Sequence, residues 1–86
     1  MREEIVRVTV KLFAAYQEAF GVSEIELELP TQSSVSVVRD RLIADRPELE
    51  KWRNLTRLGI NLQFVEPDVL LRDGDEVVLI PPVSGG

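Results

Sequence analysis

Apolar and polar residues alternate along two stretches near the start of the chain. From Ile5 to Phe13, valines and a leucine fill the even positions, and polar residues fill most of the odd ones. From Glu24 to Leu29, glutamates alternate with isoleucine and leucine in the same way. Because successive strand side chains point to opposite faces, both stretches are predicted to be strands with one buried face. The connection between them is longer than a two-residue hairpin turn.

Helical spacing follows each of these strands. Residues 14–20 favour a short helix, which the next residue, a glycine, would end. From Val35 onward, apolar residues recur every three or four positions after a pair of serines, which are favourable N-cap residues. This spacing predicts the main helix, which should end near Ala44. Pro47 interrupts it, and one further turn is expected as far as Trp52.

The second half of the chain contains three shorter strand candidates. Residues 57–61 and 64–66 are predicted to form two strands around a tight turn. Asp73-Gly74 is a strong turn signal, and the stretch Glu76–Ile80 after it is predicted to be the last strand. Two prolines follow this strand, and they should stop it because proline has no N–H to donate.

The order of these elements indicates the fold class. In a chain of 86 residues they predict an α+β domain, with a mixed sheet of about five strands and one main helix packed across it. This arrangement matches the β-grasp, or ubiquitin-like, fold. Residues 1–80 would form the β-grasp domain, and residues 81–86 an extended C-terminal tail that ends in Gly-Gly.

Charge and apolar content argue against two classes of partner. Ten basic and fifteen acidic residues give a formal net charge of −5, which disfavours a nucleic-acid partner. No apolar run approaches the roughly 20 residues that span a bilayer. The N-terminal residues also lack the long apolar core of a signal peptide. We therefore expect a cytoplasmic protein that has no membrane partner.

Cysteine and histidine are both absent. The chain therefore has no disulfide, no thiolate nucleophile and no persulfide, and it lacks the commonest neutral-pH acid–base group and the commonest transition-metal ligand. Asp73 and Asp75 flank Gly74, a pattern more typical of a turn held by side-chain-to-backbone hydrogen bonds than of a metal site. We expect no metal site and no stably bound cofactor.

Several apolar residues lie on strand faces that should be exposed. Phe13 falls on the face of the first strand that carries its polar residues. In the last strand, Val78 and Ile80 fall on the face opposite Val77 and Leu79, which should point into the core. Phe64 lies in the neighbouring hairpin. Together these residues would form a patch that binds a protein partner. The alternative interpretation is that Phe13 packs beneath a loop.

The last six residues, PPVSGG, form an unusual chain end. They span roughly 20 Å when extended. The prolines restrict the base of this tail, and the glycines make its tip thin because they carry no side chain. Such a tail suits entry into a narrow channel of another protein, where it would deliver its carboxylate. The alternative is a frayed terminus without function.

Three segments resemble one known family. The run LRDGDEVVLIPPVSGG resembles the C-terminal signature of the small, sulfur-carrying subunit of molybdopterin synthase, the MoaD family. VTVKLFAAYQEAFG resembles the opening strand and helix of that family, and GINLQFV resembles its central hairpin. The resemblance covers nearly the whole chain, apart from the residues before Ile5 and the stretch from Arg46 to Thr56.

This resemblance implies sulfur transfer at the C-terminus. An ATP-dependent adenylating enzyme would activate Gly86, and a sulfur donor protein would then displace AMP and leave a thiocarboxylate. The large synthase subunit would bring the loaded tail to cyclic pyranopterin monophosphate, in a heterotetramer of two small and two large subunits. The chain itself would be a non-catalytic sulfur donor, since ATP is used by the activating enzyme and the catalytic groups would belong to the large subunit.

The resemblance also implies roles for individual residues. Gly86 would carry the sulfur, and Gly85 would let the tail pass through a tunnel in which a Cβ would collide. Apolar residues of the sheet would contact the large subunit and the activating enzyme, namely Phe13, Phe64 and Ile80. The rest of the tail would thread the tunnel, namely Pro81, Pro82, Val83 and Ser84.

Other functions remain compatible with the sequence. A sulfur carrier of this kind can serve thiamine or cysteine biosynthesis, although the proline-proline-valine run favours the molybdopterin type. A ubiquitin-like modifier would use the same Gly-Gly tail to form isopeptide bonds with lysines. A plain interaction domain would carry an inert tail.

Overall fold

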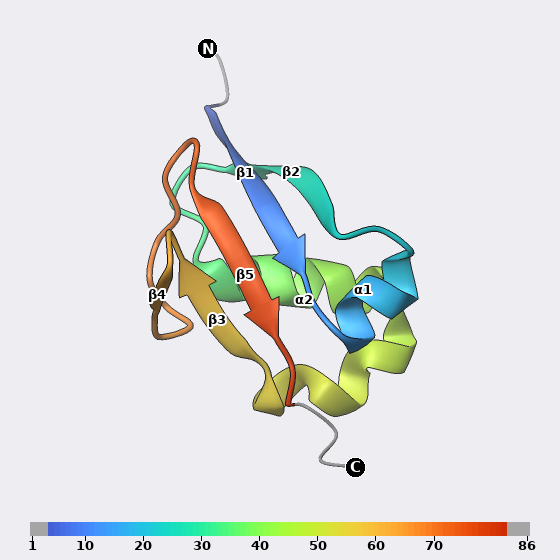
Figure 1. The fold of residues 1–86 in the computed structure, drawn as a ribbon. Coiled ribbons are helices and arrows are strands. Elements are labelled where there is room, and N and C mark those ends of the chain that lie inside the picture. The colour runs from blue at the N-terminus through green and yellow to red at the C-terminus, as the bar shows by residue number, and fades with distance from the viewer. Residues whose placement is uncertain (1–3, 83–86) are drawn as a thin grey trace.

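The computed structural model describes residues 4–82, which form a sheet crossed by one main helix (Figure 1). The elements are, in chain order, β1 Ile5–Leu12, α1 Ala15–Phe20, β2 Glu24–Pro30, α2 Val35–Asp45, the 3₁₀ helix η1 Pro47–Leu55, β3 Arg57–Ile60, β4 Gln63–Phe64 and β5 Glu76–Ile80. The predicted order and type of the elements are confirmed. Among residues 4–82, no helix has both the length and the apolar content that a bilayer crossing requires.

The sheet has the strand order β2-β1-β5-β3-β4. At its centre, β1 runs parallel to β5, whereas β1 with β2, β3 with β5 and β3 with β4 are antiparallel pairs. A parallel pair needs a crossover connection, and the segment containing α2 passes across one face of the sheet (Figure 1). The mixed five-stranded β-grasp sheet predicted from the sequence is confirmed.

The hydrophobic core lies between the sheet and α2. The even residues of β1 point into it, together with Val77 and Leu79 of β5 and the apolar side of α2. Tyr16 of α1 is fully buried, and its hydroxyl forms a 2.8 Å hydrogen bond with Thr56 Oγ1. Burial raises the pKa of Tyr16 above its ordinary value, so this side chain stays a neutral member of the core.

The start of α2 lacks the serine side-chain cap that the sequence predicts. Ser34 occupies the N-cap position, but its side chain makes no capping hydrogen bond and instead pairs with Ser36 Oγ at 2.8 Å. The first N–H groups of the helix donate to the 67–69 loop, from Val35 to Val69 O and from Ser36 to Pro67 O. Tertiary contacts satisfy the helix start, so the serine side chain is not needed there.

The segment after α2 is longer than the single turn predicted as far as Trp52. Helix η1 continues to Leu55, because Leu49 is anchored in the core and Arg53 pairs with Glu50 and Asp40. The side chain of Thr56 then donates a hydrogen bond to Trp52 O and closes the segment.

The hairpin between β3 and β4 turns earlier than predicted, so the prediction of a strand over residues 64–66 is wrong in register. Asn61 and Leu62 have positive φ values of 51° and 73°, and Ile60 pairs with Gln63 across a two-residue turn. The side chain of Asn61 fixes this turn, since it donates to Asp75 Oδ1 and accepts from the Glu76 N–H. Asp75 lies 14 residues further along the chain, so the sequence around Asn61 does not indicate this interaction.

The packing of α2 against the sheet predicts the effect of a cavity. Leu42 is 2% exposed, so Leu42→Ala should lower the free energy of unfolding by about 2–5 kcal/mol in chemical denaturation. The control Leu55→Ala removes the same atoms from a side chain that is 58% exposed, and it should change stability by less than about 0.5 kcal/mol. Equal effects of the two substitutions would contradict this account of the core.

Candidate functional site

The face of the sheet opposite α2, called here the outer face, carries the side chains that the core does not use. The strand register aligns one row of residues across it, in which Lys11 pairs with Val78, Val78 with Gly59 and Gly59 with Phe64. A second row begins with the pair of Arg57 and Ile80. Residues from four strands therefore meet on one surface, although they lie far apart in the sequence.

The predicted apolar residues are on this surface. Phe13 follows the last residue of β1 and is 44% exposed, and Phe64 is 61% exposed. Val78 and Ile80 are half-buried on the outer side of β5. Phe13 is therefore not buried beneath a loop, and the binding of a partner to these residues stays a prediction.

One exposed apolar residue of this region was missed by the sequence analysis. Leu62 is 89% exposed at the tip of the β3–β4 turn. It borders a shallow pocket of about 390 Å³ whose walls include Phe13 and Val78. A leucine flanked by polar residues gives no local signal of this exposure, which follows from the left-handed backbone of the turn.

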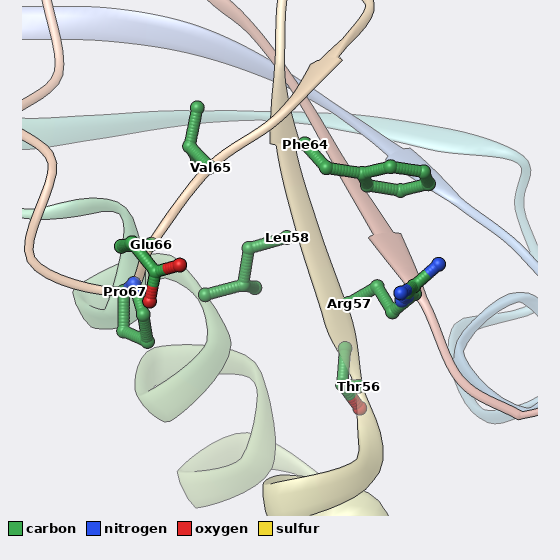
Figure 2. A pocket seen from close by; sticks show the side chains of 7 residues that line it. All are labelled: Thr56, Arg57, Leu58, Phe64, Val65, Glu66 and Pro67. Carbon is green, nitrogen blue, oxygen red and sulfur yellow. The ribbon is translucent and has the colours of Figure 1, made fainter.

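A second pocket, of about 330 Å³, lies where β3 meets β4 (Figure 2). Its lining comes from both strands and the following loop, namely Thr56, Arg57, Leu58, Phe64, Val65, Glu66 and Pro67. The guanidinium carbon of Arg57 lies 4.9 Å from the centre of the Phe64 ring. The two side chains thus form a cation–π pair at the outer face.

Two other cations of the outer face have carboxylate partners. Lys11 Nζ lies 2.7 Å from Glu24 and 3.7 Å from Glu76, and the hydrogen bond to Glu24 is the main cause of its raised pKa. Arg7 is paired with Glu28, which likewise raises the pKa of its guanidinium. These ion pairs link β1 to β2 and β5. Both cations thus have a carboxylate counter-charge within the domain.

The two acidic residues of the Asp73–Asp75 turn have structural roles. Asp73 Oδ1 accepts from the Arg7 N–H, and Gly74 donates to Arg7 O with a positive φ of 89°. The carboxylate of Asp75 accepts from the Arg72 N–H and from the Asn61 side chain. The prediction of a turn held by side-chain-to-backbone hydrogen bonds is confirmed.

The base of the tail adjoins the outer face. Pro81 is buried and Pro82 is exposed, so burial of the chain extends one residue beyond β5. The predicted sulfur site at Gly86 and the threading residues Val83, Ser84 and Gly85 lie outside the described residues. The roles assigned to the tail and to the apolar patch therefore stay predictions.

Comparisons with known proteins give a consistent result. The ThiS family model matches residues 10–86. Over 81 residues the chain is 33% identical to the molybdopterin synthase sulfur carrier subunit of Arabidopsis thaliana, covering 94% of this chain and 84% of that protein.

Two solved structures share the fold over most of their length. The crystal structure of SAMP1 from Haloferax volcanii has a TM-score of 0.79 at 26% identity, with 93% of this chain and 99% of that chain covered. A putative molybdopterin converting factor subunit 1 from Pyrococcus furiosus has a TM-score of 0.78 at 29% identity, with coverage of 91% and 99%.

The packing of Gly59 against Val78 predicts that substitutions at these two residues have coupled effects on stability. A Cβ at Gly59 would lie 2.7 Å from Val78 Cγ2, which is too close, and 3.2 Å from Gln63 O, which is a tight contact. Gly59→Ala should therefore destabilise the domain by about 1–3 kcal/mol, since the β-branched valine has few alternative rotamers.

A double-mutant cycle in chemical denaturation tests the cause. In the Val78→Ala background, Gly59→Ala should cost less than it does alone, because the closest contact is gone. Strict additivity of the two substitutions would mean that Val78 is not the group that excludes a side chain from this position.

Proposed function

Because the chain belongs to the ThiS family, in the group of molybdopterin synthase sulfur carrier subunits, we propose that its C-terminal Gly86 carries sulfur as a thiocarboxylate for molybdenum cofactor synthesis. The observation that carries this proposal is the family match, which runs through the terminal Gly-Gly. The large synthase subunit is the partner that receives the loaded tail.

The composition of the chain supports this site for sulfur. There is no cysteine, so sulfur cannot be held as a persulfide and the terminal carboxyl group is the available carrier. A carboxylate is a poor electrophile and needs activation. In an activating enzyme, the Gly86 carboxylate attacks the α-phosphate of ATP, and pyrophosphate leaves. A sulfide equivalent then attacks the acyl carbon, AMP leaves, and the thiocarboxylate is formed.

The outer face supplies the docking surface in this proposal. Phe13, Phe64 and Ile80 present apolar area on the side of the sheet that α2 leaves uncovered. Strand β5 lies in the centre of the sheet, and the base of the tail directly follows Ile80 of this surface. A partner that covers the outer face is thereby placed to receive the tail, and its own residues act on the pyranopterin substrate.

A second candidate function is protein modification through the same terminus. It is favoured by the similarity to SAMP1, which a related structure describes as a small archaeal modifier protein. In that case the activated Gly86 would form isopeptide bonds with lysines. A carrier cycles between carboxylate and thiocarboxylate, whereas a modifier accumulates as conjugates of higher mass. A sulfur carrier for thiamine or cysteine biosynthesis would form the same thiocarboxylate but would transfer its sulfur to a different acceptor molecule.

The terminal glycine provides the direct test. After incubation with the activating enzyme, ATP and sulfide, the intact mass of the full chain should rise by the difference between sulfur and oxygen, located at Gly86. Deletion of Gly86 should abolish this mass change and leave cooperative unfolding as it is in the full chain. Conjugates instead of a thiocarboxylate would favour the modifier, and no change at the C-terminus would refute both.

The apolar patch predicts the effect of an added charge. Phe13→Arg should weaken binding to the large subunit by about 2–4 kcal/mol in calorimetry, because it places a charge where apolar area is buried. Leu70→Arg is the matched control, since Leu70 is also exposed but lies in the loop that pairs with Ser34 beside α2. Equal loss of affinity in both variants would show that the patch is not the docking surface.

A further inference from the structure

The outer face contains one cation that differs from its neighbours. Arg57 is the first residue of β3, is exposed, and pairs across the strands with Ile80, the last residue of β5. Among residues 4–82, no carboxylate lies within ion-pair distance of its guanidinium, whereas Lys11 and Arg7 on the same face are already neutralised. Within the described part of the chain, the guanidinium of Arg57 therefore keeps its hydrogen-bond donors available for a group from another protein.

The side chain of Arg57 is also held in place. Its guanidinium carbon lies 4.9 Å from the centre of the Phe64 ring, and Figure 2 shows the planar group beside that ring. Stacking limits the rotamers that a long side chain can adopt, so less conformational entropy is lost when the guanidinium binds a further group. The arrangement is that of a recognition group positioned before its partner arrives.

A partner that docks on the outer face would remove water from the guanidinium of Arg57. The guanidinium lies against the Phe64 ring, so a partner that covers Phe64 also removes water from Arg57. A buried charge without a partner is unfavourable by several kcal/mol, and no carboxylate among residues 4–82 lies within ion-pair distance of this guanidinium. The partner has to supply the counter-charge, and the planar fork of arginine fits a carboxylate in two parallel hydrogen bonds.

From these observations we propose that Arg57 pairs with a carboxylate side chain of the large subunit and selects that partner. This inference rests on the proposed function, because it takes the outer face as the docking surface. A nucleic-acid phosphate is disfavoured as the counter-charge by the net charge of −5. Glu66 also lines the pocket, on the far side of Leu58 from Arg57 in Figure 2, so a partner carboxylate would pair with the guanidinium on the side away from Glu66.

The experiment measures affinity for the large subunit of the same organism by calorimetry, at low and at high salt. Arg57→Gln should weaken binding by roughly 30-fold or more, and it should reduce the salt dependence of binding. The affinity of Arg57→Lys should lie between those of the wild type and Arg57→Gln, because lysine keeps the charge but cannot form two parallel hydrogen bonds. Arg41→Gln is the matched control, since Arg41 is exposed on α2, away from the outer face, and its variant should bind like the wild type.

A charge exchange separates pairing from a merely structural role. Arg57→Glu should weaken binding more than Arg57→Gln, and replacement of the contacting carboxylate of the large subunit by arginine should restore it. Wild-type affinity in Arg57→Gln, or failure of every acidic-to-arginine variant to rescue Arg57→Glu, would overturn the pairing alone. Absence of binding by the wild-type chain, together with absence of a thiocarboxylate at Gly86, would instead overturn the proposed function on which it rests.

Discussion

The structure depends on the parallel pairing of β1 with β5 at the centre of the sheet. Two parallel neighbours cannot be joined by a hairpin, so the chain between them has to cross a face of the sheet. In this chain α2 makes the crossing and buries one face, whereas Phe13 and Phe64 on the other face stay exposed. The described residues 4–82 thus form two layers, and none of their helices packs across the outer face.

This asymmetry places the end of β5 and the outer face in one sheet. β5 is the last strand and has a hydrogen-bonded neighbour on each side, so its end is fixed in position by the whole sheet. The apolar residues of the outer face belong to the same sheet, and the base of the tail follows β5 directly. In the proposed function, a partner that recognises the outer face would therefore meet the base of the tail at a fixed position, which would lower the entropic cost of delivering a reactive group.

Much of this arrangement could be read from the sequence, because strands and helices have fixed periods. Parity alone placed Phe13 and Ile80 outward, and it separated them from Val77 and Leu79 in the core. What could not be read depends on contacts between distant residues. The turn at Leu62 is fixed by the interaction of Asn61 with Asp75, and the free charge of Arg57 follows from the absence of a nearby carboxylate in the described part of the sheet.

A carrier that delivers sulfur has to bind one protein, release it and then bind another, so its docking surface needs specificity without very high affinity. Apolar residues alone give affinity in proportion to the area that they bury, and they discriminate poorly between partners. A stacked arginine beside Phe64 changes this balance. Its desolvation offsets part of the apolar gain, and only a partner that presents a carboxylate recovers the loss.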